Sequence, residues 1–416
     1  MLIQFRFQNF KSFRDDTILD LSATKITEHG DHVVTIGKEK LLPVAAIFGA
    51  NASGKSNVFG ALFYMVMYVR ESLSLGGNKK HWQEVMELLP KWTPFLFHSS
   101  GDISVSSFEV YFTRMEHSDK TYNYGFTLDR DRIVIEEWLN VKAKTSQDFK
   151  RIFYRNDSDC DLSGLSSKMK QNIILSLEKE TLIVSLGARL KIDVLKTVYD
   201  WFYDWEFSDF GNPFENMSFY KQMPFYFWGE FSPSQIASYL SSFDPSIVDF
   251  RVERDEERKP IKVEAVHRTQ EGKTVNLPLE QESSGTLKML SLYPRLKNTM
   301  RHGGVLVIDE LNARLHPLLV RSFLLTFLDP NINKNHAQLI FTTHDAWQLS
   351  NDLLRRDEIW FTEKDGDGAS TLYSLADFQD EDGDKIRKDE NFEKNYLLGK
   401  YGAIPTLKCF DVTGEG

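Results

Sequence analysis

The segment FGANASGKSN, residues 48–57, combines residue types and a spacing that can hold a phosphate group. Gly49 and Gly54 permit a tight turn, in which successive backbone N–H groups point inward and form an anion site at a helix N-terminus. Lys55 can reach the β- and γ-phosphates of a nucleoside triphosphate, and Ser56 can ligate Mg²⁺. The residues of this segment predicted to contact the nucleotide are Gly49, Asn51, Ser53, Gly54, Lys55, Ser56 and Asn57.

An acidic pair follows a second apolar segment, GGVLVIDE at residues 303–310. A short and fully apolar run of this kind is typical of a buried parallel strand. Asp309, at the carboxyl end of that strand, is the predicted Mg²⁺ ligand, and Glu310 is placed to polarise an attacking water molecule. The alternative is that both acids are merely solvated at the end of a strand.

A third apolar segment, AQLIFTTHDAW at residues 337–347, also ends in polar side chains. In a parallel sheet, its carboxyl end meets the same edge as the acidic pair, where a side chain can sense the γ-phosphate. We therefore predict His344, together with Glu310, as a catalytic residue. The alternative is a histidine with a purely structural role.

Small polar residues open an amphipathic helix in EQESSGTLKML, residues 280–290. Taken alone this is a weak signal, because serine and threonine are ordinary helix N-caps. Pro294 is predicted to kink or end the helix that follows.

The flanking patterns predict the elements that position these residues. LLPVAAIF before the first loop predicts a buried strand, and SNVFGALFYMVMYVRESL after it is apolar at helical spacing. A phosphate loop needs this strand–loop–helix context, which argues against an accidental Gly/Ser turn. Residues 103–140 alternate in polarity in places and predict antiparallel strands.

From about residue 160 to 245 the pattern becomes helical and rich in aromatic residues, without the sustained heptads of a long coiled coil. The aromatic residues concerned are Trp201, Phe202, Tyr203, Trp205, Phe207, Tyr220, Phe225, Tyr226, Phe227 and Trp228. They either pack in the core or form a subunit or partner interface, since Trp and Tyr favour such surfaces.

The phosphate loop, the ESSGT segment, the acidic pair and the histidine, in this order, resemble the motifs of ABC-type ATPases of the RecF, SMC and OLD kind. The resemblance implies an α/β fold: a P-loop ABC-type head with a mixed sheet and an antiparallel β-lobe, plus a compact helical insertion. It also implies ATP and Mg²⁺ as cofactors and a homo-oligomer, either a dimer of heads or a higher assembly. In the family, the signature serine and glycine clamp the γ-phosphate of the neighbouring subunit, which assigns Ser283 and Gly285 to that role.

Other positions extend or depart from this resemblance. Glu282 stands where the family commonly has Leu, and Ser284 where the first Gly is common. LNARLHP, residues 311–317, matches the D-loop region, with His316 in place of the usual Asp as in OLD-like branches. The opening FQNFKSFRDDTILDLS resembles the first β-hairpin of the family, in which Lys11 precedes a strand near the nucleotide base.

We predict three regions. Residues 1–155 would be the N-terminal half of the head, 156–250 a helical insertion and candidate interface, and 251–416 the C-terminal half with a basic tail. The tail, including YLLGKYGAIP, resembles the ends of ATPase subunits in phage-defence systems of the RloA and AbiL group. OLD-type nucleases continue into a TOPRIM domain, which is not seen here, so we expect a separate nuclease or toxin protein as partner.

Composition narrows the class of protein. With 416 residues, 41% hydrophobic and 13% aromatic, the chain can bury a substantial core. No stretch has the length of a membrane span, the start lacks a signal peptide, and the two cysteines have no CxxC spacing. We therefore expect a cytoplasmic protein with no membrane partner and without a disulfide framework.

The net charge of the chain and the distribution of its basic residues bear on a second function, nucleic-acid binding. The formal net charge of −10 does not attract duplex DNA to the chain as a whole. Basic residues nevertheless gather near the end, and they are Lys385, Arg387, Lys388, Lys394 and Lys400. They form either a solvated face or a nucleic-acid contact. The alternatives to a defence ATPase are thus a RecF-like DNA-binding ATPase of repair or recombination and a non-catalytic nucleotide-binding protein.

Overall fold

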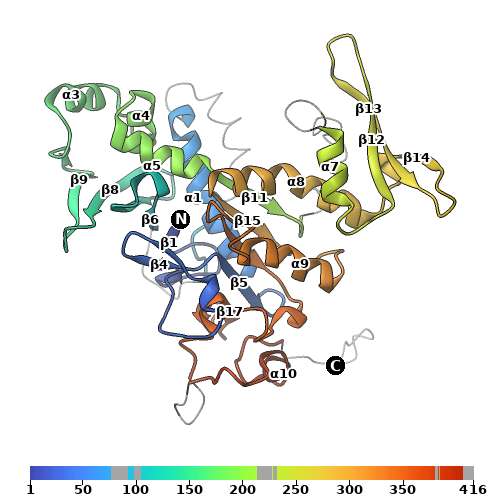
Figure 1. Ribbon diagram of the computed structural model, residues 1–416. Helices are drawn as coiled ribbons and strands as arrows, with labels where there is room; N and C mark the ends of the chain where they lie inside the picture. Colours follow the sequence, from blue (N-terminus) through green and yellow to red (C-terminus); the bar gives the residue numbers. More distant parts are fainter. Residues whose placement is uncertain are drawn as a thin grey trace, which may run out of the picture.

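A mixed sheet of short apolar strands lies at the centre of the structure, a computed structural model that describes residues 1–75, 92–97, 105–212, 227, 232–379, 383 and 385–405 (Figure 1). In spatial order its strands are β11 Trp205–Asp209, β15 Val305–Asp309, β16 Gln338–Thr342, β5 Val44–Gly49, β17 Ile359–Lys364 and β18 Ser370–Ser374. The first five are parallel, and β18 is antiparallel to β17. Strands β5, β15 and β16 are buried at every position, as expected for parallel strands covered on both faces.

A second sheet, antiparallel throughout, forms the β-lobe. In spatial order its strands are β10 Cys160–Asp161, β9 Lys150–Asn156, β8 Val134–Ala143, β7 Lys120–Leu128, β6 Ser106–Thr113, β1 Leu2–Gln8 and β2 Thr17–Asp20. Helix α1, Lys55–Leu75, shares one hydrophobic core with this lobe and with one face of the central sheet. Tyr64 of α1, Phe108 of β6 and Ile47 of β5 all belong to that core.

Helices cover the opposite face of the central sheet and form a second core with it. They are α7 Pro233–Leu240, α8 Ser284–His302, α9 Pro317–Leu328 and α10 Phe392–Leu397. A small antiparallel sheet, β12 Ile247–Arg254, β13 Pro260–Arg268 and β14 Thr274–Pro278, projects from the head beside α7 (Figure 1). The remaining helices and strands are α3 Ser167–Ser176, α4 Ile183–Arg189, α5 Asp193–Tyr203, β3 Val34–Ile36 and β4 Glu39–Leu41.

Most elements predicted around the motifs are confirmed. The first loop joins β5 to α1, the acidic pair follows β15, and β6 to β8 are antiparallel. The expected α/β fold, with a mixed central sheet and an antiparallel lobe, is confirmed. Among the described helices the longest is α1, with 21 residues, so these ranges contain no long coiled coil. No helix within the same ranges is long and apolar enough to cross a membrane.

Two local expectations differ from the structure. Pro294 lies inside α8, which continues to His302, so of its two predicted effects, a kink or an end of the helix, the second is wrong. The range 156–250, predicted as a helical insertion, also contains β11, which pairs in parallel with β15 at the edge of the central sheet. No glycine or proline separates α5 from β11, and pairing with β15 outweighs the helical pattern of this stretch.

The aromatic cluster divides between core and surface. Trp201, Phe202 and Trp205 are buried in the core shared with the β-lobe, whereas Tyr203 is 67% exposed. Phe227 is buried in the second core. Tyr220, Phe225, Tyr226 and Trp228 lie outside the described residues.

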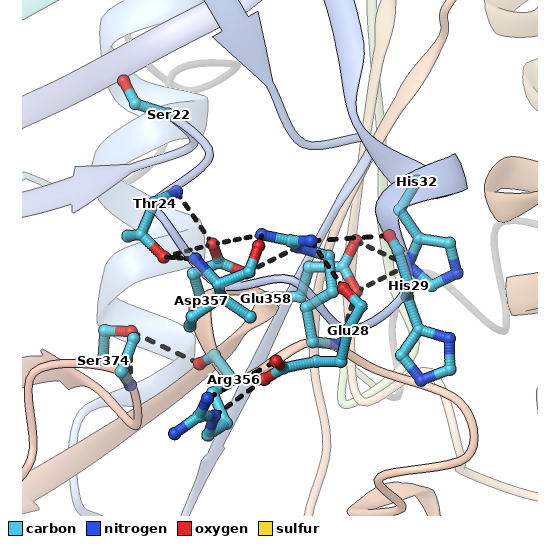
Figure 2. A network of polar contacts seen from close by, with 12 residues as sticks. Ser22, Thr24, Glu28, His29, His32, Arg356, Asp357, Glu358 and Ser374 are labelled. Carbon is cyan, nitrogen blue, oxygen red and sulfur yellow. Dashed lines mark hydrogen bonds and ion pairs between the residues drawn. The ribbon is translucent and has the colours of Figure 1, made fainter. Parts of the chain in front are cut away.

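A buried ionic network joins the N-terminal segment to the start of β17 (Figure 2). The fully buried Arg355 guanidinium donates to both carboxylate oxygens of Asp357, at 2.9 and 2.8 Å. It also donates to the carbonyl of Glu28 at 2.6 Å, and Asp357 accepts the N–H and hydroxyl of Thr24 at 2.9 and 2.7 Å. Removing one member leaves an uncompensated buried charge, which is more costly than losing an exposed ion pair.

Replacing Asp357 by alanine is therefore expected to lower the free energy of unfolding by about 3–5 kcal/mol, because Arg355 stays buried without its counter-ion. Chemical denaturation of the purified chain measures the change. The exposed neighbour Asp352 is the matched control, since Asp352→Ala should shift stability by no more than about 0.5 kcal/mol. Equal midpoints for the two variants would contradict this account of the network.

Candidate functional site

Two glycines shape the loop between β5 and α1. Gly49 has φ 155° and Gly54 has φ 119°, conformations that side chains with a Cβ rarely adopt. A Cβ on Gly49 would lie 2.5 Å from Oγ1 of Thr362, and one on Gly54 would lie 2.6 Å from Oγ of Ser370. Both positions thus require glycine for its conformation and for its small size.

Side chains from three segments hold the loop in place. The Ser53 and Thr362 hydroxyls are 2.6 Å apart, and the Ser370 hydroxyl donates to the Ser53 carbonyl at 2.7 Å. The amide of Asn57 donates to the hydroxyl of Ser12 at 2.7 Å. Ser53 and Asn57, both predicted to contact the nucleotide, therefore use these side-chain contacts to position the loop, while Asn51 is exposed.

Lys55 lies across the loop, 7% exposed. Its ammonium donates to the carbonyls of Gly49 and Ala50 at 2.8 and 2.9 Å. Burial lowers the pKa of Lys55, and the negative charges of Asp309 and Glu310 oppose that shift. The acidic pair is therefore close enough to act on the lysine electrostatically. Ser56, next along α1, is exposed.

The acidic pair is held by one threonine of the adjacent strand. The hydroxyl of Thr342 donates to the carboxylate of Asp309, which is 3% exposed, and accepts the backbone N–H of Glu310 at 2.9 Å. Glu310 has φ 54°, an uncommon conformation for a residue that carries a side chain. Such strain persists where the surroundings fix it, and it clusters at functional sites.

Two further charged groups face this site. Asp209 ends β11 in register with Asp309, and a Cβ on Gly211 would lie 3.2 Å from the carboxylate carbon of Glu310. Burial lowers the pKa of Lys11, and the charges of Asp209 and Asp309 oppose that shift. Asp209 was missed because its strand was not predicted, although WEFSD ends in an acid just as VLVID does.

His344 lies just after β16 and is exposed. The amide of Asn312 donates to its Nε2 at 3.2 Å, while Oδ1 of Asn312 accepts the hydroxyl of Thr343 at 2.8 Å. Asn312 thus orients the histidine from the loop that follows the acidic pair. The structure brings His344 to the same sheet edge as Asp309, because β15 and β16 are parallel neighbours.

Ser283 and Gly285 lie at the start of α8. Ser283 is the N-cap, and its hydroxyl accepts the N–H of Thr286 at 3.1 Å. Ser283 is exposed, and a Cβ on Gly285 would lie 3.4 Å from the Arg314 carbonyl. Within the described residues, no hydrogen bond joins the side chain of Ser283 to the phosphate loop.

A buried lysine links α8 to the loop that follows the acidic pair. Lys288 donates to the carbonyls of Leu311 and Ala313 at 2.6 and 2.7 Å and lies over the ring of Phe210, 4.0 Å from its centroid. Burial lowers the pKa of Lys288 to about 7, opposed by the charge of Glu310. A shift of α8 would therefore act on the backbone next to Glu310.

The departures from the family pattern have local partners. Glu282 contacts His267 of β13, with 2.6 Å between its Oε1 and the histidine Nε2. His316 caps α9, where its Nδ1 accepts the N–H of Leu318 at 3.2 Å. An aspartate side chain could accept the same hydrogen bond, so the presence of His316 in place of the usual Asp preserves the N-cap of α9.

A protein-family model described as "AAA domain, putative AbiEii toxin, Type IV TA system" matches residues 44–346, from β5 to just past His344. No curated protein matches the chain. Among solved structures, the chain is similar to the Smc head domain of Pyrococcus furiosus, crystallised with an extended coiled coil and bound to the C-terminal domain of ScpA. That similarity has 13% sequence identity and a TM-score of 0.41, and it covers 90% of this chain and 96% of the other.

Proposed function

The chain belongs to the AAA-domain family whose match spans residues 44–346, and on that premise we propose that it is an ATP-binding and ATP-hydrolysing switch. The observation that carries this proposal is the parallel pairing of β15 with β16 and of β16 with β5, which places the acidic pair and the phosphate loop at the same edge of the central sheet. A phosphate loop with a facing pair of acids fits a triphosphate better than any other ligand class.

The proposed roles follow from position and chemistry. The Lys55 ammonium would exchange its bonds to the carbonyls of Gly49 and Ala50 for bonds to phosphate oxygens. Ser56 and Asp309 would hold Mg²⁺, which neutralises charge on the β- and γ-phosphates when bound. Glu310 would orient and polarise the attacking water, and His344 would contact the γ-phosphate from the next strand.

We propose that two heads close on ATP. Ser283 and Gly285 lie at an exposed helix N-terminus, where free N–H groups and the helix dipole favour an anion. A second copy would therefore present its phosphate loop to this end of α8. Lys288 then gives closure a route to Glu310, because it belongs to α8 and donates to two carbonyls of the loop after the acidic pair.

Replacing Ser283 by arginine is expected to leave ATP affinity within about twofold of the wild type while lowering hydrolysis at least about tenfold, because a bulky cation blocks head engagement but not the loop. Nucleotide binding and steady-state turnover, measured on the same preparation, check this. Ser238→Arg on the exposed face of α7 is the matched control. Normal turnover by the Ser283 variant would mean that the signature is misplaced.

We further propose that this switch is the sensor or scaffold ATPase of an anti-phage, abortive-infection system of the RloA and AbiL group, acting on a separate nuclease or toxin protein. The family description, with its toxin–antitoxin context, and the YLLGKYGAIP tail support this role. ATP could then change a partner's exposure through a few kcal/mol of differential binding to open and closed heads.

Co-purification with the products of neighbouring genes, with and without ATP, tests this role together with mass measurement of the complex. A nucleotide-dependent complex with an effector is the expected result. Hydrolysis that is stimulated by DNA and falls steeply with salt, with no co-purifying protein, would favour the RecF-like alternative instead.

A further inference from the structure

Two histidines and an aspartate meet in the turn after the first hairpin, away from the phosphate loop. His29, Asp31 and His32 lie in and beside the 3₁₀ helix η1, Gly30–His32. One ligand atom from each residue lies within 4.8 Å of the other two, and the imidazole rings stack with centroids 4.9 Å apart. Figure 2 shows the two rings side by side, with His32 turned toward Glu358.

The hydrogen bonds of each histidine leave one ring nitrogen for a metal. Nε2 of His29 is 2.7 Å from the carbonyl of Asn351, so this nitrogen must carry the proton and Nδ1 keeps its lone pair. Nδ1 of His32 is 3.0 Å from the carboxylate of Glu358, which leaves Nε2 with the lone pair when Nδ1 donates. Metal-binding histidines almost always make this second contact, to a carboxylate or a backbone carbonyl.

The surrounding network fixes this turn independently of any ion. Arg355 donates to the carbonyls of Glu28 and His29, and Arg356 donates to the carboxylate of Glu28 at 2.7 Å. Glu358, fully buried, also accepts the N–H of Arg355 at 2.9 Å. The backbone at Glu28 and His29 is thus held in place before an ion binds, which reduces the entropy lost on binding.

We propose that His29, Asp31 and His32 bind one divalent transition-metal ion, with Zn²⁺ as the best fit. Imidazole nitrogens and a carboxylate suit Zn²⁺, whereas Mg²⁺ and Ca²⁺ prefer oxygen ligands. Zinc–ligand bonds of about 2.0–2.1 Å require the three ligand atoms, now within 4.8 Å of one another, to move closer together, and one of the stacked rings to turn so that both nitrogen lone pairs point at the ion. Asp31 is exposed and can complete the ligand set. Three protein ligands leave one coordination position for water.

All three ligands lie in the N-terminal turn, and the ion would reinforce the contacts of His29 with Asn351 and of His32 with Glu358, in the segment that leads into β17. Strand β17 pairs with β5, and Thr362 of β17 contacts Ser53 in the phosphate loop. The predicted effect is on the stability of this junction, so the inference does not depend on the proposed ATPase activity.

The test uses the full chain, stripped with a chelator and studied without nucleotide. Titration with Co²⁺, followed by its visible absorption, and then with Zn²⁺ should show one ion per chain and a rise in melting temperature, since an ion that binds only the folded state stabilises it. Absence of stoichiometric binding would overturn the proposal.

Two variants assign the ligands. His29→Ala and Asp31→Asn should each weaken Co²⁺ binding at least about tenfold. Asp31→Asn changes an exposed side chain and should leave the melting temperature in chelator unchanged, whereas His29→Ala also removes the hydrogen bond to the Asn351 carbonyl and should lower it. The exposed His302 provides the control His302→Ala, which should bind like the wild type. Wild-type affinity in both ligand variants would place the ion elsewhere and refute the assignment.

Discussion

Replacing Lys55 by alanine is expected to weaken ATP binding at least about 100-fold. Two charge-assisted hydrogen bonds from the ammonium to phosphate oxygens contribute about 1.5–3 kcal/mol each, and about 1.4 kcal/mol is a tenfold change in affinity. Isothermal titration with ATP, or with a slowly hydrolysed analogue, measures the loss.

The matched control is Lys38→Ala, which removes an exposed lysine of the turn between β3 and β4 and changes the net charge by the same amount. The Lys55 variant should fold, since alanine favours the helix that begins at residue 55. The Lys38 variant should fold because the side chain that it loses is exposed. If the Lys55 variant retained wild-type affinity, the loop would not be the phosphate site, and the roles given to Ser56 and Asp309 would fall with it.

The sequence was sufficient to predict those parts of the site in which a motif and its flanking strand or helix are adjacent in the chain. The phosphate loop and the acidic pair each follow a short apolar strand, and both strands occur where the pattern indicates. Parallel pairing of β15 with β16 then brings His344 to the same edge as the acids. That pairing is implied by the order of the motifs, which is why their common sheet edge could be predicted before the structure.

What could not be predicted depends on contacts between distant segments. Asp209 joins the site only because β11 pairs with β15. Glu282 departs from the family pattern at a position where its partner, His267, lies on a separate sheet. Cysteine spacing gave no sign of a metal site, while the meeting of His29 with His32 depends on a turn in which His29 has φ 46°.

Replacing Glu310 by glutamine is the change expected to separate binding from hydrolysis. Glutamine keeps the size of the side chain but is a far weaker base, so turnover should fall by about 10²–10⁴-fold. ATP affinity should remain close to wild type, because Lys55, Ser56 and Asp309 are untouched. The backbone of residue 310 should also keep its conformation, since its N–H bonds to Thr342 whatever the side chain.

A trapped ATP state should then accumulate as a closed pair of heads, visible as an ATP-dependent increase in mass by light scattering. Glu253→Gln, on the exposed face of β12, is the control that changes charge equally without touching the site. Undiminished turnover would show that Glu310 does not activate the water. If turnover is lost and ATP stays bound but no larger species forms, Glu310 remains the base. That result would count against closure of two heads through Ser283 and Gly285. The variant therefore tests the chemistry of one head and the assembly of two by different readouts.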